Sequence, residues 1–433
     1  MERRDPLLLH WQEGNRISVR VFPCTPSEDR QFKIGVTTPL KKIGTELQYE
    51  NIDFEGPNWN DAKESVHIVL DGMIEDFDAS ISLRRKNGEW HYQGNYRSDW
   101  KLNFDAPEIS QEAFSFNGRN FKMQNYESKT IPFETKEVYL DLHRGWSGRD
   151  MRRVWNLMND KGIDVFVYTN KMERLTANNY NRLVGELSFA NFNLFPFHKI
   201  KNPNQALVIT QDSKLTPNLN DIKNTKFAKE LEAFLIQQEN PIRLFHLGDE
   251  LSPYLKTLKE IRTFTYEKNN FLKLSNYIKT NTFADSGEDN RSVVIHDAAI
   301  KIIEKEGMIE NKNATDHLMR LFCYNDLMKK MGDGYFDKKT LAQTLIDQAQ
   351  ESHVVSPISS MIVLETQKDY DRFGIEKSKN SLENASFKST GAVPEPHEWL
   401  LILLGGLLGL YLVRKRKSEL VRELEKNNVR IFF

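Results

Sequence analysis

Cysteine is scarce in this chain: its 433 residues include only two, Cys24 and Cys323. Neither belongs to a CxxC pair or a histidine-rich cluster, so the spacings of zinc and iron–sulfur sites are missing. A small scaffold held together by several disulfides is likewise excluded. We expect two buried free thiols, while one long-range disulfide between them stays an alternative outside the cytoplasm.

An excess of charge is also missing, since 60 Lys and Arg balance 61 Asp and Glu. The net charge of −1 gives no reason to expect nucleic acid as a partner. Hydrophobic residues at 39% and aromatic residues at 11% are enough to build folded cores, which a disordered chain would lack. The length predicts two or three domains.

Long apolar runs are absent from the amino-terminal segment. Its apolar stretch is three leucines, Leu7, Leu8 and Leu9, which is too short for a signal peptide. Catalytic signatures are missing too: the sequence contains no nucleophile elbow, glycine-rich phosphate loop or HExxH motif. Isolated histidines such as His198, His246 and His353 are expected to be surface or core residues.

Alternation of apolar and polar residues predicts strands through the first part of the chain. The runs are Ile17–Val21, Phe32–Val36, Val66–Leu70, Ile81–Leu83, Trp90–Tyr92 and Phe114–Phe116. Asn87-Gly88 and Asn117-Gly118 lie between such runs, where a tight hairpin needs positive φ. Residues 1–130 are therefore predicted to form an antiparallel β-sandwich-like region.

The period of the pattern changes after about residue 131. Short apolar runs at Val138–Leu140, Val165–Val167, Ala206–Ile209 and Ile242–Phe245 are typical of buried strands. Between them, residues 151–158, 183–187 and 227–235 have helical spacing, with Ser147 or Asp150 as a possible N-cap of the first helix. This alternation predicts a doubly wound α/β domain with a mostly parallel sheet over 131–280.

The next part of the chain has mainly helical spacing. Residues 281–375 are predicted to be helical, with stripes at 318–328 and 341–349 and a terminal β segment at 361–364. Residues 376–392 are small and polar, which is typical of a flexible linker.

The carboxyl-terminal segment, 393–433, combines three features in order. Val393, Pro394, Glu395 and Pro396 come first, an uncharged stretch over 399–413 follows, and then Arg414, Lys415, Arg416 and Lys417. The stretch would cover roughly 22 Å as a helix, against about 30 Å for a hydrocarbon core. We expect a short transmembrane helix at 399–413, with the basic residues in the cytoplasm and the body of the protein on the other side. A buried core helix is the alternative.

This order of parts resembles the PEP-CTERM sorting signal of Gram-negative bacteria, which exosortases recognise. The resemblance implies that Val393–Pro396 is the sorting motif and Arg414–Lys417 the membrane stop. The segment after Lys417 is longer than such tails usually have. The resemblance further implies an inner-membrane protein with a single pass, extracytoplasmic body and surface location after processing.

The body resembles a VIT domain followed by a von Willebrand A-type domain. Residues 5–23, ending in Phe22-Pro23, and residues 31–40 are similar to the second half of a VIT domain. Residues 353–365 resemble the segment that follows the A-type domain in the proteins sorted by exosortase N. The first strands of a VIT domain are missing before Asp5, so the chain is expected to be truncated at its amino terminus.

The resemblance to A-type domains also points to one candidate metal site. Such domains often hold Mg²⁺ through an Asp-x-Ser-x-Ser motif, a Thr in a second loop and an Asp in a third. Asp141 and Asp212 match the two aspartates, but His143 and Gly145 replace the two serines and no clear Thr is present. Since imidazole is a poor ligand for Mg²⁺, we expect the site to be degenerate and no cofactor to be bound. Alternatively, both aspartates cap helices or orient loops.

Taken with the resemblance, the sequence predicts an α+β multidomain protein: a partial VIT-like β-sandwich region, a doubly wound von Willebrand A-like domain, a helical region and one carboxyl-terminal transmembrane helix. Its expected function is non-enzymatic binding or adhesion at the cell surface, with the membrane, an exosortase and a protein or polysaccharide ligand as partners. The first alternative is a membrane scaffold of the sorting or exopolysaccharide machinery. The second is a hydrolase that uses Asp141, His143 and Asp212.

Overall fold

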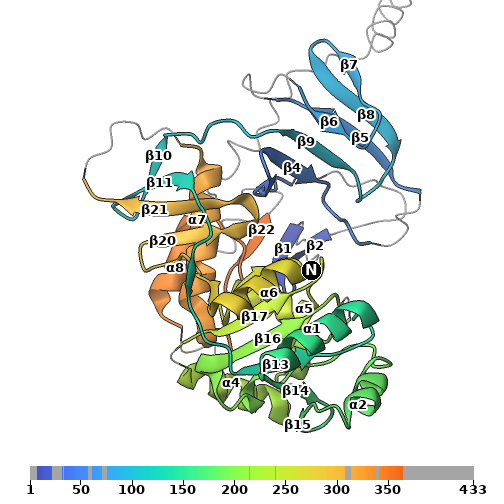
Figure 1. Ribbon diagram of the computed structural model, residues 1–433. Helices are drawn as coiled ribbons and strands as arrows, with labels where there is room; N and C mark the ends of the chain where they lie inside the picture. The colour runs from blue at the N-terminus through green and yellow to red at the C-terminus, as the bar shows by residue number, and fades with distance from the viewer. Residues whose placement is uncertain are drawn as a thin grey trace, which may run out of the picture. The chain divides into compact units, whose positions relative to one another are not determined.

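The computed structural model describes residues 7–21, 32, 34–56, 61–70, 76–213, 215–238, 240–307, 314–336 and 341–363. The helices and strands belong to one unit, Met1–Gln31 with Val36–Ile375 (Figure 1). A second unit comprises Phe32–Gly35 and Glu376–Phe433, and its described residues form no helix or strand.

The central sheet has six strands in the order β15-β14-β13-β16-β17-β18. Their bounds are Met172–Arg174 (β15), Asp164–Tyr168 (β14), Glu137–Asp141 (β13), Ala206–Thr210 (β16), Ile242–His246 (β17) and Phe264–Lys268 (β18). All neighbours pair in parallel except β15, which is antiparallel to β14. Every residue of β16 is buried, as expected for a strand covered on both faces.

Helices cover both faces of this sheet (Figure 1). On one face, α1 (Gly148–Asp160), α2 (Tyr180–Leu187) and α6 (Phe271–Thr280) bury their apolar stripes against Val138 and Leu140. On the other, α4 (Lys226–Gln237) and α5 (Pro253–Glu260) pack on Tyr139, because successive strand residues point to opposite faces. The short α3 spans Leu219–Ile222. The predicted strands at 138–140, 165–167, 206–209 and 242–245 are confirmed, as is Ser147 as the N-cap of α1.

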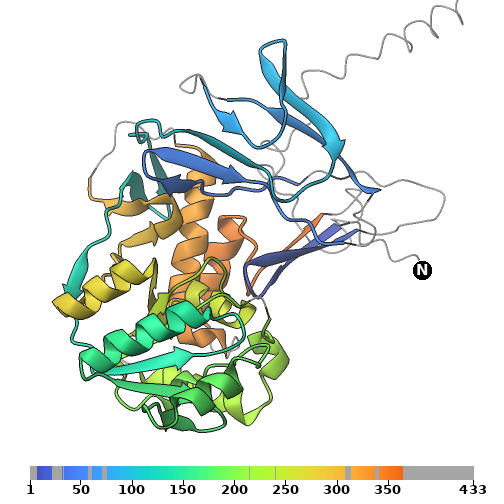
Figure 2. The same cartoon turned by 45° about the vertical axis from the view of Figure 1, so that its right-hand side comes forward.

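The first described strand pairs with the last. β1 (Leu7–Gln12) lies between β2 (Arg16–Val21) and β22 (Ser360–Val363), antiparallel to both (Figure 2). Trp11 of β1 is buried in the same core as Tyr254 of α5 and Leu327 of α7 (Asp316–Met331). Packing therefore crosses the boundaries that the sequence suggested at 130 and 280.

A second core is built from segments that precede and follow the parallel sheet along the chain. Strands β10 (Ala113–Phe116), β11 (Arg119–Asn125), β21 (Ile300–Lys305) and β20 (Ser292–Ile295) form an antiparallel sheet in that order. Phe114 and Phe121 of this sheet contact Phe322 of α7, with ring centroids 5.8 and 4.1 Å away. Cys323 is a buried free thiol, as predicted, whereas Cys24 lies outside the described residues.

Two further antiparallel sheets enclose a third core around Ile81, Trp100, Leu102 and Phe104. One sheet has the order β3-β4-β9-β6 and the other β5-β8-β7. Their bounds are Lys41–Ile43 (β3), Glu46–Glu50 (β4), Lys101–Asp105 (β9), Asp78–Ala79 (β6), Lys63–Ile68 (β5), Glu89–Asn95 (β8) and Arg84–Lys86 (β7). The predicted hairpin turns are confirmed, because Asn87, Gly88, Asn117 and Gly118 all have positive φ.

The remaining elements are short. β12 (Thr130–Pro132) pairs with β19 (Thr282–Ala284), and α8 spans Gln343–Glu351. The 3-10 helices are Phe197–Lys199, Pro203–Gln205, His296–Ala298 and Gly332–Tyr335.

Several sequence-based element predictions are wrong. Residues 34–36 form no strand, and Val36 is exposed. Ile81 and Leu83 also lie outside strands, although Ile81 is buried in the third core, because an irregular segment can also bury alternate side chains. Residues 292–305, predicted to be helical, contain strands β20 and β21. Their β-branched runs favour strands.

The predicted fold class as a whole is also corrected. The described residues form a mixed α/β structure with several separate sheets and eight α-helices. Among those residues, no helix is long and apolar enough to cross a membrane. The helix expected at 399–413 lies outside the described residues.

Candidate functional site

The strand order of the central sheet identifies its most promising edge. The chain winds outward from β13 in both directions, to β14 on one side and to β16 on the other. In open α/β sheets, ligands bind beyond the carboxyl ends of the strands at such a switch point. Asp141 ends β13, and its register partner Thr210 ends β16. The two predicted aspartates therefore follow the two strands that flank the switch point.

Asp141 is buried and only partly satisfied. Its Oδ2 accepts a hydrogen bond from Thr210 Oγ1 at 2.9 Å, whereas its Oδ1 is buried without a partner. Burial raises the pKa of Asp141 to about 7, although Thr210 and Asn193 lower this pKa by a smaller amount. The Asn193 side chain is near enough to act on the pKa, although its Nδ2 makes no hydrogen bond. At neutral pH, a large fraction of this carboxyl group is therefore protonated.

His143 is a buried and neutral side chain. Its Nδ1 accepts a hydrogen bond from the Gly145 backbone N–H at 3.0 Å, and its Nε2 is buried without a partner. Burial lowers its pKa, and a contact with the Gln211 backbone and the charge of Asp212 only partly offset this. A nitrogen that accepts from the backbone within its own loop stabilises that loop and is not free to bind a metal ion.

Asp212 joins its own loop to the one after β17. Its Oδ1 accepts from the backbone N–H groups of Asp249 at 2.5 Å and Glu250 at 2.8 Å. The same oxygen lies 3.5 Å from Nε2 of His246, a buried residue whose Nδ1 contacts the Tyr266 hydroxyl at 2.8 Å. Burial lowers the pKa of His246 to about 4, more than Asp212 raises it. The ring is thus neutral at pH 7, and the 3.5 Å contact is not an ion pair.

Two glycines allow these loops to approach closely. A Cβ on Gly145 would lie 1.9 Å from the Asp212 carbonyl oxygen and 2.8 Å from the His143 ring. A Cβ on Gly248 would lie 2.1 Å from Asp212 Oδ1. Gly145, which takes the place of a metal-binding serine in the resemblance, is therefore required by packing around Asp212 and His143.

A side-chain network that the sequence did not suggest holds the start of α1. Gln211 accepts from the Ser147 backbone N–H at 2.7 Å and donates to Asp150 Oδ2 at 3.0 Å. The Ser147 hydroxyl donates to the same carboxylate at 2.8 Å. His246 was expected to be a surface or core residue and is buried. Thr210 and Gln211 were missed because their roles depend on strand register. The signal available in the sequence was their position at the end of a buried strand.

Asp141, His143 and Asp212 thus lie at one edge of the sheet, but they bond different segments: the end of β16, the loop of His143 itself and the loop after β17. Asp141 Oδ1 and His143 Nε2 remain without a partner. In the described part of the chain, the grouping of His, Cys, Asp and Glu that could jointly hold a metal ion lies elsewhere, in strands β5 and β8. The predicted sorting residues Val393–Pro396 and Arg414–Lys417 lie outside the described residues.

We expect the full chain to show no micromolar Mg²⁺ site in a calorimetric titration. The partly protonated Asp141 and the missing hydroxyl groups at 143 and 145 leave too few hard oxygen ligands. The Asp141→Ala variant should give the same isotherm as the wild type. A micromolar site that disappears in this variant would contradict the expectation.

A hollow of about 480 Å³ lies away from this edge, beside β11 and β21. Its lining consists of Glu108, Ile109, Gln111, Lys122, Met123, Gln124, Asn125 and Lys305. These residues include no histidine, cysteine or hydroxyl nucleophile, so the switch-point edge remains the better candidate site.

Comparisons with known proteins identify no relative from which a function could be transferred to this chain. No protein-family model matches the sequence, and no curated protein is significantly similar to it.

Proposed function

We propose that this chain is a non-enzymatic surface protein, with a VIT-like and von Willebrand A-like body, which an exosortase sorts and processes through the 393–396 motif. Its role is binding or adhesion. One observation carries the non-enzymatic part: the polar side chains at the switch point hold loops together and do not converge on a common point. Asp141 bonds Thr210, His143 bonds Gly145, and Asp212 bonds the loop at 249–250.

The burial and hydrogen bonds of Asp141, His143 and Ser147 favour binding over hydrolysis. A hydrolase needs a nucleophile and a base within hydrogen-bond reach of each other and of substrate. Asp141 and His143 are only 3% and 1% exposed, and the nearby Ser147 hydroxyl is used as a helix cap. The pKa of Asp141 near 7 and the unpartnered Asp141 Oδ1 and His143 Nε2 favour acid–base chemistry. Catalytic turnover lost in His143→Ala would support that alternative.

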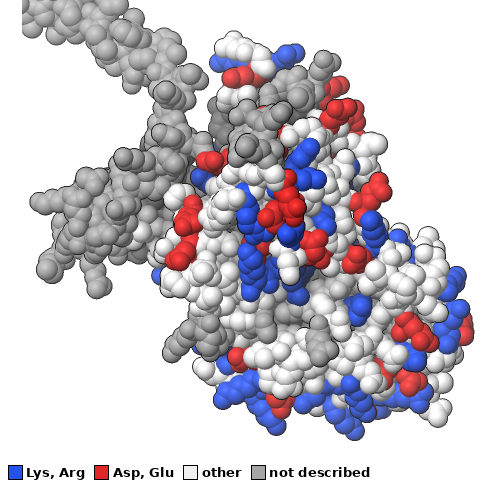
Figure 3. Space-filling view, turned by 90° about the vertical axis from the view of Figure 1, so that its left-hand side faces the viewer, with Lys and Arg blue, Asp and Glu red and all other residues white. Residues whose placement is uncertain are grey.

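The loops that these contacts order form a surface suited to recognising a ligand. Asp212, with a side chain 47% exposed, stands among the loops after β13, β16 and β17. Ligand binding at such an edge is common because loops vary on a rigid sheet. On the face shown in Figure 3, acidic and basic side chains lie side by side around the centre, and Lys and Arg predominate along the lower edge. The near-zero net charge of the whole chain, −1, favours a protein or polysaccharide partner over nucleic acid.

The sorting motif supplies the test of the localisation proposal. A plain anchor would need only apolar length and flanking charge, so the Pro394-Glu395-Pro396 sequence is the part that processing by an exosortase would require. In the source bacterium, we expect a carboxyl-terminal tag on the protein to be lost when the exosortase gene is intact and retained when it is deleted. Changing Pro394, Glu395 and Pro396 to Ala should abolish the loss, as followed by blotting from both ends.

Changing Lys388, Ser389 and Thr390 to Ala gives a matched control in the predicted linker, and its tag should be lost as in the wild type. A tag that stays attached in both strains would refute processing. That outcome would favour the scaffold alternative, in which the tail is kept.

A further inference from the structure

Two histidines face each other on neighbouring strands of the β5-β8-β7 sheet. His67 of β5 and His91 of β8 are direct register partners in the antiparallel pair. Glu89 precedes His91 by two residues, so its side chain points to the same face of the sheet. The opposite face is apolar, since Val66, Ile68 and Tyr92 pack in the third core. The backbone of all three residues is therefore anchored by a packed sheet.

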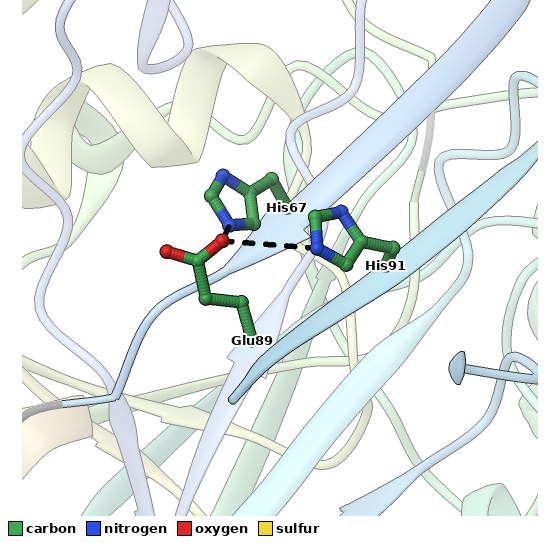
Figure 4. Close-up of side chains that lie close together, drawn as sticks. All are labelled: His67, Glu89 and His91. Atoms are coloured by element: carbon green, nitrogen blue, oxygen red, sulfur yellow. Dashed lines mark hydrogen bonds and ion pairs between the residues drawn. The ribbon is translucent and has the colours of Figure 1, made fainter. Parts of the chain in front are cut away.

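The side-chain atoms of these residues converge (Figure 4). Glu89 Oε2 lies 2.7 Å from His67 Nε2 and 3.8 Å from His91 Nε2. All three ligand atoms lie within 4.8 Å of one another. The two imidazole rings are stacked, with centroids 4.5 Å apart and planes at 8°.

This donor set matches the preferences of zinc and its neighbours among the divalent metals. Zn²⁺ binds imidazole nitrogen and carboxylate oxygen at about 2.0–2.2 Å in a tetrahedron. Neighbouring ligand atoms of such a site are about 3.3 Å apart, a value between the two distances from Glu89. The stacked rings must tilt so that both Nε2 lone pairs meet the ion. Side chains that are 48% and 37% exposed have room for this rotation.

We propose that His67, Glu89 and His91 bind one divalent transition-metal ion, with Zn²⁺ the best fit. Three protein ligands leave one tetrahedral position open for water or for a side chain of a partner. The plain alternative is an exposed charge contact, which would stabilise the fold by about 0–1 kcal/mol at most. Strand register alone brings the two rings together, and Glu89 Oε2 adds a third donor atom within 4.8 Å of both Nε2 atoms.

Two positively charged side chains on the neighbouring strand oppose metal binding at this site. Arg84 and Lys86 of β7 are register partners of His91 and Glu89 and are exposed. Their charges disfavour a bound cation, but exposed charges are weakly felt through water and salt.

The test uses the full chain without a histidine tag, after treatment with a chelator. Titration with ZnCl₂ by calorimetry should give one ion per chain, and MgCl₂ in excess should not displace it. His67→Ala and His91→Ala should each weaken zinc binding at least about tenfold, because loss of even an outer-shell partner costs metal sites that much. Glu89→Gln should also weaken binding while preserving side-chain volume.

Matched controls separate this site from general binding to surface histidines. Gln93→Ala changes the same face of β8, and His317→Ala removes an exposed histidine of α7; both should bind zinc as the wild type does. Zinc should also protect His67 and His91 against diethylpyrocarbonate, as measured by peptide mass spectrometry. No one-to-one binding, or equal binding by the His67→Ala and His91→Ala variants, would overturn the proposal.

Discussion

The Asp141→Asn variant is expected to become more stable, relative to the wild type, as the pH rises from 4 to 8. The folded state holds the proton of Asp141 up to a pKa of about 7, whereas the unfolded chain loses it near the ordinary value of 3.8. Its contribution to stability is therefore fully present below pH 3.8 and is lost as the pH rises through 7. The difference between the two pKa values corresponds to about 4 kcal/mol of unfolding free energy. The wild type loses this stability as the pH rises, whereas the variant, whose Asn is always neutral, does not.

The measurement is urea unfolding at several pH values, with hydrogen exchange of the 137–147 peptide as a local readout. The comparison with the wild type removes the contributions of other buried groups, such as Glu260, whose pKa burial also raises to about 7. Asp160→Asn, an exposed aspartate at the end of α1, is the matched control and should follow the wild-type curve. Parallel curves for Asp141→Asn and the wild type would show that Asp141 ionises normally.

The Gly145→Ser variant is expected to lose about 3 kcal/mol or more of stability and to gain no Mg²⁺ site. The substitution introduces a hydroxyl at the position that matches a metal-binding serine in the resemblance, but its Cβ would lie 1.9 Å from the Asp212 carbonyl oxygen. A backbone atom cannot move away without also displacing the loop that Asp212 holds against Asp249 and Glu250.

Gly148→Ser provides the control for this variant. No atom lies within 4 Å of a Cβ built there, so its stability should stay within about 0.5 kcal/mol of the wild type. Thermal unfolding and calorimetry with MgCl₂ measure both effects. Normal stability of Gly145→Ser, or a new micromolar Mg²⁺ site, would show that the loop adapts and that packing does not require the glycine.

The parallel sheet could be predicted because its strands are buried on both faces and separated by helices with a clear period. The sequence identified β13 and β16, and with them the positions of Asp141 and Asp212 at the strand ends. Short strands such as β20 and β21 were missed because the stripes of α7 and α8 dominated the pattern around them. The pairing of β1 with β22 depends on contacts between distant segments, which periodicity does not contain.

The contacts of the candidate sites were harder to predict than their positions. Asp212 was expected to be either a metal ligand or a residue that orients loops, and its bonds to the 249–250 loop follow from how β16 and β17 align. His67 and His91 have no motif spacing in the sequence. They meet because β5 and β8 pair in one particular register, which a shift of one residue would destroy.

The pairing of β1 with β22 has a consequence for how the chain is made. Ribosomes add about 5–20 residues per second, so roughly 20–70 s separate the synthesis of the two strands. During that interval, Leu7, Leu9 and Trp11 can pair with β2 but lack β22 and their full core. An apolar strand with an open edge is a template for aggregation. The newly made chain should therefore depend on a chaperone that shields its first strand until residue 363 has emerged.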